Sequence, residues 1–329
     1  SRGVVIEIEG PPQKIRELIE RLTASPPPQA DIQNISEQVI PRKDETDFRI
    51  IKSSGAGELA VGMPPDLAVC DECIKELFDP DNRRYRYPFL NCTNCGPRFS
   101  IIQELPYDRD KTSMSRFRMC KSCQAEYNEP ADRRFDAQPN ACPDCGPTLE
   151  LRDADEEVLS GDAITESAKR LKEGAIIAIK GLGGFHLSCS ALDENATRKL
   201  RQRKSRPAKA LAVMFSDVSE IGRHCYVDEA DEAELLSPAS PIVILRRRST
   251  SNLPSIISPD TNDIGAFLPY TPLHHLLLTH VSPLVMTSAN LRDEPIAVDI
   301  AQARQLLGPV ADYILDHDRA IIRRCDDSV

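Results

Sequence analysis

The pattern of apolar and polar positions is densest from about residue 160 onward. Short apolar runs there alternate with segments of helical apolar spacing, which predicts buried strands alternating with amphipathic helices. Ala175–Ile179 is a continuous apolar run, and the segment before it begins at Asp162, a helix-capping residue type, and ends at Gly174. Residues 160–329 are therefore expected to form an α/β domain with a twisted sheet, in which ligands bind beyond strand ends. Further strands are expected at Leu211–Phe215, Pro241–Leu245, Ile264–Leu268 and Leu284–Thr287, and helices at 194–203, 229–236, 272–280 and 299–307.

The first residues of the chain carry a thinner pattern, typical of a small α+β unit. Val4–Ile8 alternates in polarity as a half-buried strand does, and Pro11 and Pro12 open a segment with helical apolar spacing, which a run of prolines ends. Further strands are expected at Ile32–Ile40 and Phe48–Ile51. Such a short unit buries little apolar surface alone, so this region is expected to be the remnant of a domain truncated at its N-terminus.

Between these regions lies a duplicated cysteine motif. Four C-x-x-C pairs occur, and the second two repeat the first two with an offset of 50 residues. Eighteen residues separate the two pairs of each copy. Two such pairs supply four thiolates, the ligand set of a tetrahedral structural zinc ion. One ion is expected on Cys70, Cys73, Cys92 and Cys95, and a second on Cys120, Cys123, Cys142 and Cys145.

Paired cysteines also occur as disulfides, as redox-active sites, or as metal sites assembled from two copies. The regular duplication favours zinc, and no histidine lies between Cys70 and Cys145 to complete a mixed ligand set. A crossed arrangement would need the two copies to interleave. Residues 66–150 are therefore expected to be tandem zinc fingers, preceded at 53–66 by a linker rich in Ser, Gly and Pro.

The charge balance bears on the partners of the fingers. Residues 70–150 contain 12 Lys and Arg against 14 Asp and Glu, and the whole chain has a net charge of −10. Nucleic-acid binding needs a positive surface, so a scaffolding role between domains is favoured. No apolar run is long enough to span a bilayer, and metal-ligand thiols fit a reducing cytoplasm, so a cytoplasmic protein is expected. The remaining Cys189, Cys225 and Cys325 are expected to be buried thiols.

Four segments of the α/β region carry candidate site residues. Lys180–His186 contains three glycines that would let backbone approach a ligand, but their spacing is not that of a dinucleotide fingerprint, and a tight strand-to-helix turn explains them equally well. Arg203–Lys209 gathers several cations at a helix end, a pattern that is usually a solvated face or favourable charge near a helix C-terminus. Thr287–Asn290 places two hydroxyls and an amide after a strand, where they could bind polyphosphate, ribose or a base, and a simple turn is the alternative. Arg323–Ser328 sets cations beside paired carboxylates, which could form ion pairs or hold Mg²⁺.

Taken together, these segments resemble a known family. Lys-x-Arg at 204 and 206, followed by Ser-x-Asn at 288 and 290, is similar to the KxR…SxN signature of YrdC-like domains, which bind ATP and form carbamoyl-type adenylates. With the cysteine repeat before it, the sequence resembles the HypF family of hydrogenase-maturation carbamoyltransferases over essentially its whole length. The resemblance implies the end of an acylphosphatase-like domain at 1–53, two zinc fingers, and most of a YrdC-like domain.

The resemblance implies a three-step pathway. Carbamoyl phosphate is hydrolysed to carbamate, and carbamate and ATP then form carbamoyl-adenylate. The carbamoyl group finally passes to the partner HypE, to supply the cyanide ligands of NiFe-hydrogenase. Only adenylation is expected here, because the acylphosphatase arginine and asparagine and the C-terminal transferase domain are not in the sequence. Lys204 and Arg206 are the expected catalytic residues, and Mg²⁺ is expected with ATP. Nucleotide and substrate binding is assigned to Lys180, Gly184, His186, Lys204, Arg206, Lys209, Ser288, Asn290 and Ser328.

Two other functions stay open on the sequence. Related enzymes make threonylcarbamoyl-adenylate from threonine, bicarbonate and ATP for tRNA modification, but the cysteine repeat and the acidic balance argue against that product. A zinc-dependent binding or regulatory module without catalysis is the other, since paired C-x-x-C units also resemble the zinc region of DnaJ-type chaperones. A threonine requirement for pyrophosphate release would favour threonylcarbamoyl-adenylate synthesis. A lack of affinity for ATP with Mg²⁺ would favour the non-catalytic module.

Overall fold

The computed structural model describes residues 5–26, 30, 32, 34–47, 63–206, 208–290 and 295–329. The chain divides into two compact units, Ser1–Gly62 and Met63–Val329. The second unit contains both the cysteine repeat and the α/β region. Within the described part of the chain, no helix is long and apolar enough to cross a membrane.

The first unit contains the predicted helix. Helix α1, Pro12–Ala24, has a proline in its first turn, where the missing N–H costs no hydrogen bond, and it ends before the run of prolines. None of its residues is buried.

The strands predicted for the first unit are absent from its described residues. Neither the described part of Val4–Ile8 nor that of Ile32–Ile40 is a strand, while Phe48–Ile51 and most of the predicted linker lie outside the described residues. Val39 is 98% exposed. The backbone N–H groups of residues 43 to 45 donate to the side-chain carboxylate of Glu9, whereas strand residues would donate to a neighbouring backbone. Alternating polarity therefore did not suffice, because a strand also needs a backbone partner.

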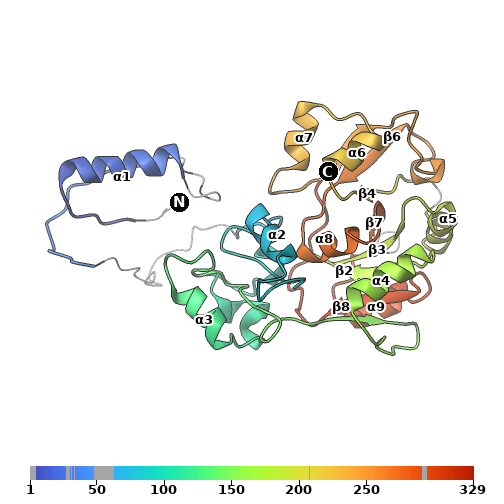
Figure 1. Cartoon of the computed structure of the whole chain (residues 1–329), viewed down its shortest axis with the longest axis horizontal. Helices are drawn as coiled ribbons and strands as arrows, with labels where there is room; N and C mark the ends of the chain where they lie inside the picture. The colour runs from blue at the N-terminus through green and yellow to red at the C-terminus, as the bar shows by residue number, and fades with distance from the viewer. Residues whose placement is uncertain are drawn as a thin grey trace. The chain divides into compact units, whose positions relative to one another are not determined.

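The second unit is built on a mixed sheet whose strand order is β1-β8-β2-β3-β7-β4-β6-β5. Strand β2 runs parallel to β8, and β4 to β6, whereas the other neighbours pair antiparallel. Figure 1 shows β2, β3 and β7 in the middle of this unit. The strands are β1 Leu149–Arg152, β2 Ile177–Lys180, β3 Phe185–Ser190, β4 Val213–Met214, β5 Val243–Arg246, β6 Asp263–Phe267, β7 Leu284–Ser288 and β8 Tyr313–His317.

Helices cover both faces of the sheet. Leu171 of α4 and Leu276 of α8 belong to one hydrophobic core, and Leu200 of α5 and Ala303 of α9 belong to the other. Each helix of this region follows an Asp or Thr whose side chain accepts a first-turn backbone N–H, as the sequence indicated for Asp162. The helices are α4 Ala163–Lys172, α5 Glu194–Arg203, α6 Val218–His224, α7 Glu229–Leu235, α8 Pro272–Leu278 and α9 Ile300–Leu307, with a short 3₁₀ helix at Ser255–Ile257.

The predicted α/β alternation is confirmed, with differences. Every strand and helix expected beyond residue 160 is present within a few residues of its expected bounds, but β1, β3, β8 and α6 were not predicted. The strand-to-helix turn suggested for Lys180–His186 is wrong, because the glycines lead directly into β3, which pairs antiparallel with β2. Cys189 and Cys225 are buried as expected, whereas Cys325 is exposed.

The cysteine repeat forms two finger modules that belong to the same compact unit as the sheet. Leu77 of α2 contributes to the core formed by α4 and α8, and the Phe89 ring meets His317 of β8 edge-on at 5.1 Å. The backbone N–H of Val69 donates to the Tyr270 carbonyl at 3.1 Å. The module helices are α2 Asp71–Phe78 and α3 Lys121–Asn128, with 3₁₀ helices at Phe99–Ile101, Arg109–Lys111 and Ser113–Arg116.

Candidate functional site

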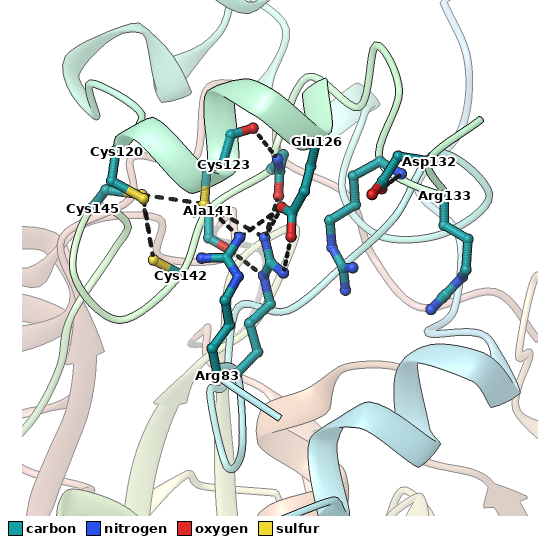
Figure 2. Close-up of polar contacts among 12 residues, drawn as sticks. Arg83, Cys120, Cys123, Glu126, Asp132, Arg133, Ala141, Cys142 and Cys145 are labelled. Atoms are coloured by element: carbon teal, nitrogen blue, oxygen red, sulfur yellow. Dashed lines mark hydrogen bonds and ion pairs between the residues drawn. The ribbon is translucent and has the colours of Figure 1, made fainter. Parts of the chain in front are cut away.

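Two clusters of four cysteines lie in the fingers. Within each cluster the sulfur atoms all lie within 4.8 Å of one another. Each cluster draws on one copy of the repeat, so the crossed arrangement is excluded and the predicted grouping is confirmed. Figure 2 shows the second cluster beside α3. The groups are Cys70, Cys73, Cys92 and Cys95, and Cys120, Cys123, Cys142 and Cys145.

The local fold explains why these cysteines can hold a metal ion. Cys70 and Cys120 stand directly before α2 and α3, so their sulfurs lie at helix N-termini, whose partial positive charge favours thiolates. Cys70 Sγ lies 3.7 Å from Cys92 Sγ, and Cys73 Sγ lies 3.6 Å from Cys95 Sγ. A tetrahedron with zinc–sulfur bonds of about 2.3 Å has edges of about 3.8 Å. The clusters therefore fit structural zinc.

A second group of polar residues gathers around Lys204, at the C-terminal end of α5. Its ammonium donates to Thr287 Oγ1 and to Asn290 Oδ1, both at 3.4 Å, and to the Ser288 carbonyl. Ser288 Oγ donates to Asn290 Oδ1 at 2.9 Å. The Lys-x-Arg and Ser-x-Asn segments, more than 80 residues apart in sequence, thus meet through one ammonium group.

Hydrogen bonds from two arginines stabilise the loop after Lys204. Arg206 donates to Thr287 Oγ1 at 3.1 Å and to the Ala210 carbonyl at 3.2 Å. Arg201, a buried residue of α5, donates to the carbonyls of Arg206 at 2.9 Å and of Lys209 at 3.1 Å. The Lys209 side chain is exposed. No sequence pattern indicates this role of Arg201, because it depends on how the loop folds back over the helix.

The electrostatics around Lys204 favour an anion. Burial, followed by the charges of Arg206 and Lys209, lowers the pKa of Lys204 to about 7. Burial also lowers the pKa of Arg206. Two half-desolvated cations side by side are unfavourable until negative charge approaches them. An anionic group such as a phosphate would relieve that cost.

The glycine segment and the C-terminal segment meet beside this group. His186 of β3 is the register partner of Ser288 of β7. His186 Nε2 lies 2.9 Å from Asp327 Oδ2, and Tyr270 donates to Asp327 Oδ1 at 3.1 Å. A side chain at Gly183 would lie 2.2 Å from the Cys325 carbonyl oxygen, so only glycine allows the two segments to pack this closely.

Other predicted site residues are engaged elsewhere. The Lys180 ammonium donates to the His317 carbonyl at 2.7 Å and pairs with Asp316 at 3.0 Å, both on β8. The Ser328 carbonyl accepts the Ile242 N–H at 2.8 Å. A methyl group at Gly184 would clash with Ile296, so this glycine is needed for packing. Within the described part of the chain, the hydrogen bonds and ion pairs of Lys180 and Ser328 do not reach Lys204.

From the sequence, no role was assigned to Tyr270, and Thr287 and Asp327 were named only as members of candidate segments. Thr287 supplies one of the two hydroxyls expected at the end of its strand, and it accepts from both Lys204 and Arg206. Asp327 was expected to form ion pairs or to hold Mg²⁺; its carboxylate lies 2.9 Å from His186 Nε2 and accepts from Tyr270. Nothing in the sequence pattern pointed to Tyr270, because only the tertiary fold brings the loop before α8 to the end of the chain.

Three family models match the chain. They are described as Acylphosphatase, over residues 1–50, HypF finger, over residues 69–102 and 119–152, and Telomere recombination, over residues 169–329. Carbamoyltransferase HypF from Synechocystis sp. is 48% identical and matches 100% of this chain and 43% of its own length. The Rhodobacter capsulatus protein of the same name is 46% identical over 100% of this chain and 44% of its own. The chain is homologous to the HypF carbamoyltransferases along its whole length.

Solved HypF structures have the same fold. The crystal structure of full-length HypF in the phosphate- and nucleotide-bound form matches with a TM-score of 0.91 and 46% identity, covering 97% of this chain and 42% of that one. The crystal structure of T. kodakarensis HypF matches with a TM-score of 0.88 and 42% identity, covering 98% of this chain and 41% of that one. The chain therefore spans less than half the length of the HypF proteins it matches.

Proposed function

We propose that the α/β region, residues 160–329, forms carbamoyl-adenylate from ATP and carbamate. The main support for this proposal is that Lys204 and Arg206 lie against the segment from Thr287 to Asn290 and donate hydrogen bonds to it. A carbamate oxygen attacks the α-phosphorus of ATP, forming an O–P bond as the bond to pyrophosphate breaks. The reaction needs positioning and countercharge more than covalent help from the protein, and this group offers both.

Each polar residue of the group has a proposed role. Lys204 makes contacts with Thr287 Oγ1 and Asn290 Oδ1 that are long, at 3.4 Å, so a phosphate oxygen can replace them at little cost. Arg206 offers a planar fork of donors for a second phosphate contact. Ser288 and Asn290 orient the nucleotide or the carbamoyl end. The relative bound to phosphate and nucleotide supports the nucleotide assignment.

The remaining assignments have supporting roles. Lys209 is placed to add charge from the exposed side of the loop, and backbone amides near Gly184 and His186 line the small carbamate pocket. Lys180 keeps a proposed substrate-binding role that would require its present contacts with β8 to change, and Ser328 keeps one for its side-chain hydroxyl. Mg²⁺ accompanies ATP, carbamate derives from carbamoyl phosphate, HypE is the final acceptor for the complete protein, and the protein works in the cytoplasm.

Exchange of radiolabelled pyrophosphate into ATP tests this proposal. With ammonium carbamate as substrate, Lys204→Met should lower the exchange rate about 100-fold or more, since it removes a preorganised countercharge. Lys172→Met, which removes an exposed lysine at the end of α4, is the matched control and should leave the rate unchanged. Exchange that persists in Lys204→Met, or that requires threonine, would contradict the proposal.

A further inference from the structure

The two fingers exchange arginines. Arg83 lies in the first copy of the repeat, yet its Nη2 donates to Cys123 Sγ of the second cluster at 3.3 Å. Arg133 occupies the same place in the second copy, and its Nη2 donates to Cys73 Sγ of the first cluster at 3.1 Å. Each metal site therefore receives a charge-assisted hydrogen bond from the other finger.

A carboxylate fixes each arginine pair across the boundary between the copies. Glu126 of α3 accepts from Arg83 at 2.6 Å and also from Arg84, as Figure 2 shows for Arg83. Glu76 of α2 accepts in the same way from Arg133 and its neighbour Arg134. The same pair of contacts thus occurs twice, in opposite directions.

The second arginine of each pair donates to the turn that carries the second C-x-x-C pair of the other finger. Arg84 is buried and donates to the Ala141 carbonyl at 2.7 Å and to Asn140 Oδ1 at 3.0 Å. Arg134 donates to the Asn91 carbonyl at 3.1 Å. Ala141 and Asn91 each directly precede a cluster cysteine, so these bonds position a ligand-bearing turn.

The placement of these arginines in the sequence links the two metal sites. Arg83 and Arg84 lie in the loop between Cys73 and Cys92, so the first metal ion, by closing that loop, holds in place the arginines that serve the second cluster. A zinc ion with four thiolates carries a net charge of about −2, which such donors stabilise. The converse holds for the loop between Cys123 and Cys142.

From these contacts we infer that the two clusters form one cooperative metal unit, in which an ion at either site strengthens binding at the other through the exchanged arginines. The thiolate-bonded Arg83 and Arg133 act as positioning residues for the site opposite their own. The fingers are then a single folding element with two ions, and partial metal loss is disfavoured.

Chelator challenge followed by thiol alkylation tests this inference on the full chain. The zinc-loaded protein is treated with EDTA, the released cysteines are trapped with N-ethylmaleimide, and peptide mass spectrometry assigns the label to each cluster. The unmodified chain should pass from unlabelled to labelled at both clusters together. Accumulation of chains labelled at one cluster, in the proportion expected for independent sites, would overturn the inference.

Reciprocal substitutions give the decisive signature. Arg83→Gln should accelerate labelling of the Cys120–Cys145 cluster about tenfold or more and make it lose metal first. Arg133→Gln should reverse the order, with the Cys70–Cys95 cluster labelled first. Arg86→Gln is the matched control, because the Arg86 side chain pairs with Asp162, outside both clusters, and this variant should behave as the unmodified chain does.

The order of labelling separates this coupling from general destabilisation. A misfolded variant would label both clusters at the same increased rate. Equal acceleration at both clusters in both variants, or first release from the cluster in the same finger as the substituted arginine, would contradict the inference. Arg83→Lys, which keeps the charge but loses the planar fork, should give the same order with a smaller increase in rate.

Discussion

The fingers and the group around Lys204 both contain pairs of neighbouring cations, but the two regions differ in what these cations bind. Arg83 and Arg84 both donate to the Glu126 carboxylate. Burial by itself lowers the pKa of Arg83, but the hydrogen bonds that Arg83 donates to Glu126 and Cys123 raise it above its ordinary value. Lys204 and Arg206 donate to carbonyl, hydroxyl and amide oxygens. The arginine pairs of the fingers are thus compensated by carboxylates, whereas no carboxylate of the described residues pairs with Lys204 or Arg206.

This difference separates a structural from a binding arrangement of charge. A compensated pair stabilises the fold and has little to gain from a ligand, while uncompensated half-buried cations are held at a cost that an anion can offset. The difference can be tested by removing compensation where it exists and by supplying it where it is lacking.

The largest effect is expected for Cys73→Ser, which removes a ligand from the first cluster. Structural zinc contributes several kcal/mol to folding, so the unfolding free energy should fall by on the order of 5 kcal/mol or more. Elemental analysis should show loss of at least one of the two zinc ions per chain. Cys325→Ser changes an exposed thiol outside the clusters and should leave zinc content and stability as they are.

Glu126→Gln removes compensation in the fingers. Burial raises the pKa of Glu126, but hydrogen bonds from Arg84 and Arg83 outweigh it and hold the pKa at about 2, below the usual 4.5. The ionised form therefore contributes stability that is present above about pH 4.5 and is lost as the pH falls toward 2. At neutral pH, urea unfolding should show a loss of about 2 kcal/mol.

The matched control for Glu126→Gln is Glu72→Gln, which breaks an exposed pair with Lys75. Exposed pairs are screened by solvent and contribute little to stability, so Glu72→Gln should unfold at nearly the same urea concentration as the unmodified chain. Equal losses in the two variants would mean that the exchanged arginine pairs do not depend on their carboxylates.

Asn290→Asp supplies compensation at the candidate nucleotide site. The new carboxylate would stand where Asn290 Oδ1 lies, 3.4 Å from the Lys204 ammonium. The unfolding free energy should rise by about 1 kcal/mol, while affinity for ATP with Mg²⁺ should fall about tenfold or more through charge repulsion. Calorimetric titration measures the affinity, and unchanged ATP binding would show that Lys204 is not a phosphate contact.

The smallest expected effect is a proton taken up on binding. Because the pKa of Lys204 is about 7 in the free protein, its ammonium is roughly half protonated at pH 7, and a bound polyphosphate raises the pKa again. ATP binding should therefore take up about half a proton at pH 7 and nearly a whole one at pH 8. Calorimetry in buffers of different ionisation enthalpy measures this uptake, and Lys204→Met should abolish it.

Sequence reasoning reached different depths in the two regions. The metal clusters were predicted completely, because each set of ligands lies within one copy of a short repeat and C-x-x-C turns position their sulfurs locally. Around Lys204, the meeting of two short motifs was expected through family resemblance, but the role of Arg201 and the pairing of His186 with Asp327 were not predicted. Those contacts join strands and loops that are distant in sequence, and no local periodicity records them.

The strands show the same limit. β2 and β7 were recognised because each contains a continuous apolar run, whereas β1 and β8, in which an acidic residue interrupts the strand, were missed. At Val4–Ile8 the error runs the other way, because the alternating pattern predicted a strand that the described residues do not form.

By itself, the sequence determined the α/β alternation, the helix starts at Asp and Thr caps, and the grouping of eight cysteines into two metal sites, because these depend on interactions between near neighbours. Only the tertiary structure decided which cations are compensated. Arg83 meets its carboxylate 43 residues away, and Lys204 meets its acceptors more than 80 residues away. Charge compensation is a through-space property, so the fold alone separates the braced fingers from the cationic site.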